Sequence, residues 1–217
     1  MKKTFYIAAI VIYLSASTNA QVMIIPERRN YNQFDWEVTN SFSLGMSKTS
    51  IDRGSSNEAG YYYNDPGENT FYSESALAIG FFIFDGLSVE PEIDFNFLTD
   101  EASVSIIGNL CYTLSIPRKN IYPYFKIGYG ISGFESNNYY YYDSDTGGLF
   151  ESLESGVLSS SIGLKIVNSS TNAFRLELNY KRFNNSVSFF DTFYQSTQQY
   201  DISTDAISIV FGYSFLF

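Results

Sequence analysis

Few residues of this chain could perform acid–base or nucleophilic chemistry. It has no histidine and a single cysteine, Cys111, among 217 residues. Without imidazole there is no Ser-His-Asp or Cys-His arrangement, in which histidine carries the proton, and the commonest zinc ligand is also missing. One thiol excludes a thiolate metal cluster and an intramolecular disulfide. The sequence therefore predicts a protein that is not an enzyme and that has no resident cofactor, with calcium as the one candidate metal.

That candidate is an acidic segment, residues 143–154, which nearly matches the calcium-binding loop of an EF-hand. Carboxylates occupy its first, third, ninth and twelfth positions, and Gly148 provides the sharp turn at the sixth. These carboxylates belong to Asp143, Asp145, Glu151 and Glu154. The flanking segments are not helical in pattern, and Gly147 replaces the usual ligand at the fifth position. We therefore expect either weak Ca²⁺ binding or a solvated acidic loop without metal.

A second group of charged residues stands at alternate positions within apolar segments. Alternation places successive side chains on opposite faces of a strand, so we expect all ten to face one interior. The ten are Glu37, Glu74, Glu90, Glu92, Asp94, Lys126, Lys165, Arg175, Glu177 and Lys181. Confined charges are costly unless they are paired, so this network predicts a salt-bridged plug. The alternative is an ion-selective or gated path.

The elements that would position these charges are eight segments of alternating large apolar and small or polar residues. They are 36–47, 71–83, 87–97, 104–114, 121–131, 158–166, 174–181 and 205–217. The last one reads Ile207, Ile209, Phe211, Tyr213, Phe215, Phe217 on one face. A membrane-spanning strand needs about 9–11 residues. The pattern predicts an all-β fold, an eight-stranded antiparallel up-and-down transmembrane β-barrel.

The connections between these segments alternate in length. Tight turns are expected at 85–86, 117–120 and 168–172, and long polar stretches at 48–69, 135–156 and 184–200, with a short exception at 99–102. Short turns on one side and long loops on the other are typical of outer-membrane barrels with both termini in the periplasm. The interior of an eight-stranded barrel holds little beyond its own side chains, which favours the plug.

The first 20 residues have the three parts of a secretory signal peptide. Lys2 and Lys3 precede an apolar stretch, and small residues lead to a cleavage site after Ala20. Residues 1–20 are thus predicted to be removed, leaving 21–217 as one barrel domain. The mature chain would have 11 basic and 23 acidic residues, which argues against a nucleic acid as partner. Export is predicted to end in the outer membrane of a Gram-negative bacterium.

Three segments of the chain resemble the outer-membrane β-barrel superfamily of OmpA-like and OmpX-like proteins. They are Ser88 to Phe95, Tyr122 to Gly130, and Phe211 to Phe217. The resemblance implies insertion by the barrel-assembly machinery, with Tyr213, Phe215 and Phe217 forming the recognition signal. It implies contact with outer-membrane lipids. We expect no periplasmic peptidoglycan-binding domain after Phe217, so the cell-wall anchoring of full-length OmpA proteins does not carry over.

The long loops provide the remaining functional indication. They contain Tyr61 to Tyr63 and Tyr139 to Tyr142 among many acidic residues. Exposed tyrosine suits binding surfaces, although these residues could equally form an aromatic girdle. The sequence predicts a structural, adhesion or surface-recognition protein with an unknown extracellular ligand. A narrow porin-like channel and a secreted soluble barrel, which would also alternate, are the rival interpretations.

Overall fold

The computed structural model describes residues 31–53, 69–98, 102–116, 120–135, 153–191 and 196–217. These residues form eight strands and no helix that could span a membrane. The strands are β1 (Trp36–Arg53), β2 (Asn69–Phe84), β3 (Leu87–Leu98), β4 (Ala102–Thr113), β5 (Ile121–Glu135), β6 (Leu153–Ser169), β7 (Asn172–Asp191) and β8 (Ser196–Leu216). The predicted signal peptide, 1–20, lies outside the described residues.

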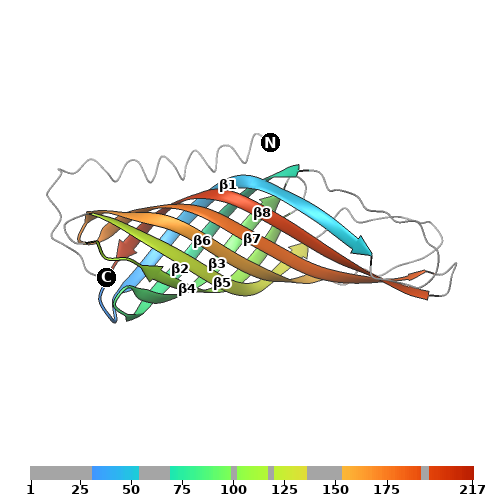
Figure 1. The fold of residues 1–217 in the computed structure, drawn as a ribbon, viewed down its shortest axis with the longest axis horizontal. Coiled ribbons are helices and arrows are strands. Elements are labelled where there is room, and N and C mark those ends of the chain that lie inside the picture. Colours follow the sequence, from blue (N-terminus) through green and yellow to red (C-terminus); the bar gives the residue numbers. More distant parts are fainter. Residues whose placement is uncertain (1–30, 54–68, 99–101, 117–119, 136–152, 192–195) are drawn as a thin grey trace.

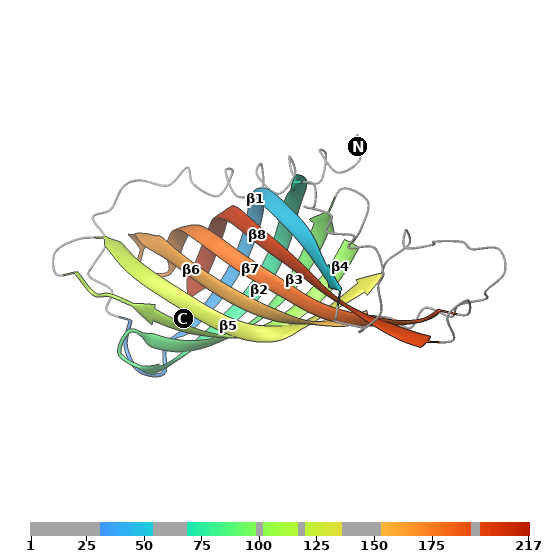
Figure 2. The same cartoon turned by 45° about the vertical axis from the view of Figure 1, so that its right-hand side comes forward.

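All eight strands form one closed barrel in which each strand pairs antiparallel with its neighbours in the chain. Figures 1 and 2 show the strands winding obliquely around a common axis. Closure is made by β1 and β8, which pair from Glu37↔Leu216 to Arg53↔Tyr200. Beyond that ladder, Trp36 and Phe217 exchange backbone hydrogen bonds of 3.2 and 2.9 Å. The predicted fold class and topology are confirmed.

The two faces of each strand differ in the way that the alternation predicts. The buried face carries mostly charged, small and hydroxyl side chains, with some aromatic and aliphatic ones, and the exposed face carries large apolar ones. Seven of the side chains that we expect outside are between 38% and 54% exposed: Trp36, Ile79, Phe95, Ile127, Leu164, Leu178 and Phe211. Phe42, also expected outside, is half-buried. The barrel therefore has a polar interior and an apolar exterior.

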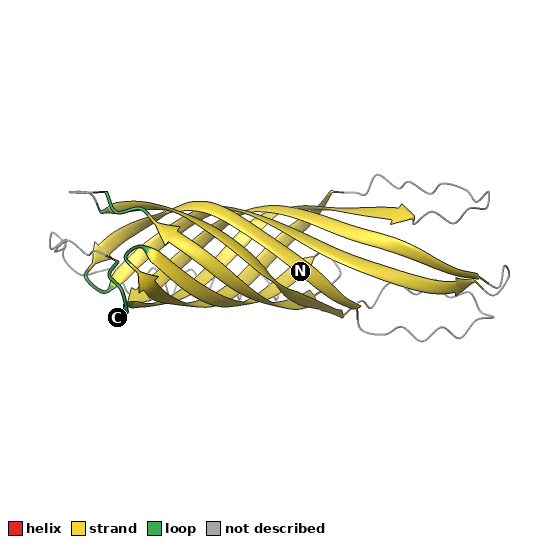
Figure 3. Ribbon diagram, turned by 60° about the horizontal axis from the view of Figure 1, so that its bottom comes forward, coloured by secondary structure: helices red, strands yellow, loops and turns green. Residues whose placement is uncertain are grey.

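The two ends of the barrel are built differently. At one end, called here the turn end, β2 and β3 are joined by Asp85-Gly86 and β6 and β7 by Ser170-Thr171. Gly86 has φ of 79°, and a Cβ there would lie 2.5 Å from the Thr113 carbonyl oxygen, so the turn requires glycine. The opposite end, called the loop end, is where β7 and β8 extend past the shorter strands (Figure 3).

One expected loop is largely strand. The stretch 184–200 was predicted to be a long polar loop, but β7 and β8 remain paired through it as far as Asp191↔Ser196. Similarly, β1 continues to Arg53. The prediction was wrong because it took the polar composition of this stretch as the mark of a loop, whereas a strand is held by its backbone hydrogen-bond ladder, which continues through polar residues.

Candidate functional site

Arg175 organises the part of the interior nearest the turn end. Its guanidinium lies between two carboxylates, with Nε donating to Glu37 at 3.1 Å and both terminal nitrogens donating to Glu90 at 3.0 and 3.2 Å. Lys165 donates to the second oxygen of Glu37 at 2.6 Å. All four side chains are at most 1% exposed. Two cations thus neutralise two carboxylates. The planar guanidinium of Arg175 donates two parallel hydrogen bonds to the Glu90 carboxylate, a geometry that arginine favours.

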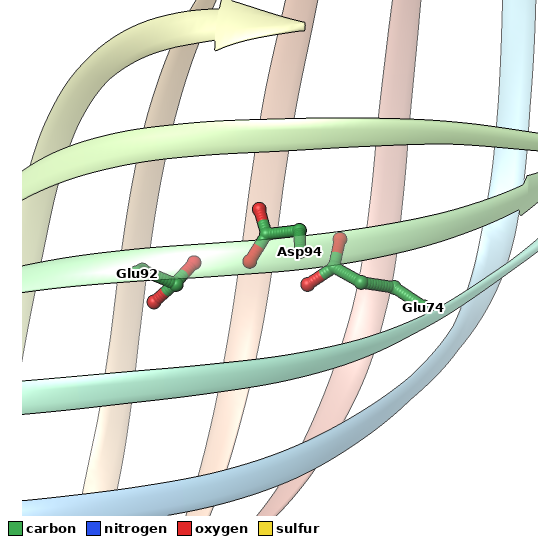
Figure 4. Close-up of side chains that lie close together, drawn as sticks. All are labelled: Glu74, Glu92 and Asp94. Atoms are coloured by element: carbon green, nitrogen blue, oxygen red, sulfur yellow. The ribbon is translucent and has the colours of Figure 1, made fainter. Parts of the chain in front are cut away.

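Lys181 forms a second centre nearer the loop end. Its ammonium contacts Glu74 at 2.7 Å, Asp94, and Glu92 at 3.7 Å. Figure 4 shows these three carboxylates together, from β2 and β3, with one oxygen of each within 4.8 Å of the others. Tyr72 donates to Glu74 and lies 2.7 Å from the Asn96 amide oxygen. The Lys181 ammonium is therefore within ion-pair distance of three carboxylates.

Lys126 links the two centres. Its ammonium lies 2.8 Å from Glu92 and 3.5 Å from Glu177, and Glu177 in turn lies 3.9 Å from Arg175. The ten charged residues predicted to face the interior are therefore all inside the barrel, in one connected network. Among them carboxylates outnumber cations by six to four, and the excess lies in the half nearer the loop end. Oδ1 of Asp94 has no hydrogen-bond partner.

An aromatic cap, which the sequence interpretation missed, closes the interior at the turn end. Tyr31, from the segment before β1, is 1% exposed and packs on Phe82 and Tyr122 with ring centroids 5.1 and 5.3 Å away. The Lys165 ammonium lies 4.8 Å from the centroid of the Tyr31 ring, a cation–π contact. Val167, Ala173 and Leu216 complete the cluster.

This cap is held by backbone contacts of the same segment. The Phe34 amide donates to the Phe82 carbonyl at 2.7 Å, and the Gly86 amide donates to the Tyr31 carbonyl at 3.0 Å. Phe34 adopts φ of 72°, a strained conformation for a bulky residue. The aromatic residues at inward positions beside the short turns, Phe82 and Tyr122, were the signal that could have revealed the cap.

A second apolar cluster lies on the other side of the charged network. It consists of Tyr72, Ile107, Val157, Phe183 and Ala206, all at most 4% exposed. The charged network therefore lies between two clusters of buried apolar side chains. Such packing leaves the described interior suited to holding its own charges rather than to binding a solute.

The proposed assembly residues lie on the outer face at the turn end of β8. Phe217 and Phe215 are 71% and 48% exposed, and Tyr213 is half-buried, 5.1 Å from Phe215 between ring centroids. Their role in recognition by an assembly machine stays a prediction. Of the proposed calcium ligands, Asp143, Asp145 and Glu151 lie outside the described residues, as does the side chain of Glu154. The calcium prediction therefore also stays open.

Comparison with solved structures shows which known proteins share this architecture. The chain is similar to the outer membrane protein OprG from Pseudomonas aeruginosa, with 14% identity over 88% of this chain and 99% of that one, and a TM-score of 0.55. It is also similar to the outer membrane protein AlkL in DMPC lipid bilayers, with 17% identity over 91% and 96% of the two chains and a TM-score of 0.51. No family model matches the chain, and no curated protein matches it. The chain thus has the fold of eight-stranded outer-membrane barrels.

Proposed function

We propose that this chain is a non-enzymatic protein of a bacterial outer membrane that acts at the cell surface. In this proposal residues 1–20 are a cleaved signal peptide, the barrel is the membrane anchor, and the acidic, tyrosine-rich loops serve adhesion, recognition or the integrity of the envelope. The chemistry would reside in the loops, because the interior pairs its charges among themselves.

The outer surface supports the membrane placement. On β8 the outward residues from Ile207 to Phe217 are all apolar or aromatic. The ten steps from Ile207 to Phe217, each rising about 3.3 Å along a strand tilted by about 40°, cover about 25 Å of height, which matches the apolar band of outer-membrane barrels. The two similar structures are outer membrane proteins by name. A soluble barrel would place this band in its core.

The single observation that carries the surface role is the closed interior. Ten paired charges lie between two apolar clusters, and the Tyr31 cap blocks the turn end. A protein that moved solutes through its lumen would need a hydrated route along this axis. A closed barrel leaves the two ends and the outer wall as the places where partners can bind.

A narrow ion channel is the second candidate, and one observation favours it. The half of the interior nearer the loop end has more carboxylates than cations, and Asp94 Oδ1 has no hydrogen-bond partner. Excess negative charge in a lumen would favour cations, as rings of acidic side chains do in cation channels.

Conductance in planar bilayers separates the two candidates. The refolded protein should show no reproducible current steps, because the caps exclude a continuous water path. A variant in which the large side chains of both apolar clusters are removed, with Tyr31, Phe82, Tyr72 and Phe183 each changed to alanine, should leak more than the wild type, which shows that the assay detects an opened lumen. Reproducible, cation-selective steps from the wild type would favour the channel and refute the closed-barrel proposal.

The surface role is tested by replacing residues 54–68 and 136–152 with short Gly-Ser linkers. The barrel should still fold, because the strands and the charged network that the structure describes are built from residues outside these two segments. Cells producing this variant should attach less to plastic and to matrix-coated surfaces than cells producing equal amounts of wild type. Unchanged attachment and unchanged envelope integrity would remove the support for a loop-based function.

A further inference from the structure

Three charged residues form a row across the outer wall near the loop end. Strand register places Lys48 of β1 opposite Asp205 of β8, and Asp205 opposite Arg182 of β7. The outer two side chains are exposed, Arg182 by 45%. Adjacent strands lie about 4.8 Å apart, so the backbones of Lys48 and Arg182 are about 10 Å apart, with the carboxylate between them.

This row marks the upper edge of the apolar band. The next outward residues toward the turn end are Met46, Ile207 and Tyr180, again directly opposite one another. Met46 and Ile207 are 59% and 57% exposed. On all three strands the change from apolar to charged therefore occurs at the same row. On each of these strands, this change is where the acyl chains of a membrane would give way to headgroups.

The row is also where the outward basic residues gather. Of the six basic residues whose side chains the structure describes, four lie inside the barrel, and only Lys48 and Arg182 lie outside. The whole chain has a formal net charge of −10. Two exposed cations on β1 and β7, the two strands that flank β8, therefore form a local exception in an acidic protein.

The carboxylate between them is held in place by a neighbour. Tyr180, at the edge of the apolar band, donates its hydroxyl to Asp205 at 2.6 Å. Arg182 contacts the same oxygen through Nε at 3.9 Å and donates to the Asn184 side chain at 3.2 Å. These contacts fix the guanidinium at the surface, with one carboxylate against two cations. The row keeps a net positive charge for an outside anion.

We propose that Lys48 and Arg182 bind the phosphate groups of a phosphorylated glycolipid, of the lipid A type, in the outer leaflet of the outer membrane. The inference rests on the proposed membrane location with the loop end outside. Arginine and lysine at the end of an apolar surface extend their charged groups toward headgroups, and guanidinium matches phosphate geometry. Binding by Lys48 and Arg182 would thereby hold one particular kind of lipid next to the barrel.

The test titrates lipid A into phosphatidylcholine vesicles that contain the refolded full chain. Urea unfolding is followed by the fluorescence of Trp36, the single tryptophan. A ligand of the native state raises the unfolding midpoint as its concentration increases, which gives an apparent affinity. Each basic residue near an anionic surface contributes about five-fold to binding. The double variant Lys48→Gln/Arg182→Gln should therefore bind lipid A about 25-fold more weakly than the wild type.

A matched control removes the same charge elsewhere. Arg118→Gln/Lys119→Gln changes two basic residues that lie between β4 and β5 in the sequence, and should leave the lipid A affinity unchanged. Arg182→Lys, which keeps the charge, should retain most of the binding. Dephosphorylated lipid A and phosphatidylglycerol should both raise the midpoint far less than lipid A.

Two outcomes would overturn the inference while leaving the proposed function intact. One is an equal lipid A affinity for the wild type and the double variant, both folded in the vesicles. The other is an equal effect of phosphatidylglycerol, which would show attraction to any anionic lipid. Failure of the wild type to fold in vesicles of any composition would instead refute the membrane location on which the inference depends.

Discussion

Replacing Arg175 with methionine removes the cation that holds the charged network together near the turn end. Methionine keeps much of the volume of the side chain but removes its donors to Glu37 and Glu90, which include three hydrogen bonds of 3.0–3.2 Å. Both carboxylates are at most 1% exposed. Breaking a buried ion pair by removing one partner costs about 3–5 kcal/mol. With a slope of about 2 kcal/mol per molar urea, the unfolding midpoint should fall by about 2 M.

Two companion variants make this prediction specific to the buried pair. Arg182→Met makes the same chemical change at an exposed arginine 3.9 Å from Asp205, and should cost less than about 1 kcal/mol. Adding Glu90→Gln to Arg175→Met leaves Lys165 with Glu37, one cation for one carboxylate, and should restore much of the lost stability. Urea titration in phosphatidylcholine vesicles measures all three. A cost below about 1 kcal/mol for Arg175→Met, or a further loss on adding Glu90→Gln, would refute the paired-charge account.

Three further predictions concern the ends of the barrel. Tyr31→Ala, which removes a ring packed on two aromatic neighbours and over Lys165, should lower the free energy of unfolding by about 3 kcal/mol, measured by urea titration; no loss would show that the cap is unimportant. Deletion of Phe217 should reduce folded protein in the outer membrane and increase periplasmic degradation, while the stability of the folded fraction barely changes; unchanged yield would contradict an assembly signal. If residues 143–154 bind calcium, millimolar Ca²⁺ should protect them from proteolysis and Glu154→Gln should abolish the protection; protection without calcium dependence would leave a plain acidic loop.

The alternation of side chains was enough to predict the barrel and the ten charged residues that face its interior. Most inward charges, such as Asp94 or Lys126, stand between apolar sequence neighbours, and period two assigns them to the opposite face. The alternation is clear in the sequence because consecutive residues of a strand face, in turn, the apolar exterior and the polar interior of the barrel. Eight such segments, joined alternately by short and long connections, are most simply arranged as an up-and-down barrel in which the first and last strands pair.

That the inward cations pair with inward carboxylates could be predicted, and Lys126 and Arg175 do so, but the individual partner of each cation could not be assigned. Arg175 meets Glu37 and Glu90 across 138 and 85 residues of sequence. Which carboxylate a cation reaches depends on the stagger of the strands around the barrel, and one side-chain sequence is compatible with several staggers. Tyr31 was missed for a related reason. It precedes the first alternating segment, and its partners on β2 and β5 become neighbours only when the barrel closes.

Fluorescence quenching of Trp36 by brominated lipids tests most directly whether the apolar exterior faces a bilayer. Trp36 is the single tryptophan, is 47% exposed on the outer face, and stands at the turn end beside Phe217. In vesicles of brominated phosphatidylcholine its emission should be strongly quenched, and bromine near the headgroup should quench more than bromine deep in the acyl chain. Equal emission in brominated and ordinary vesicles, with the protein folded, would contradict a barrel whose outer wall contacts lipid.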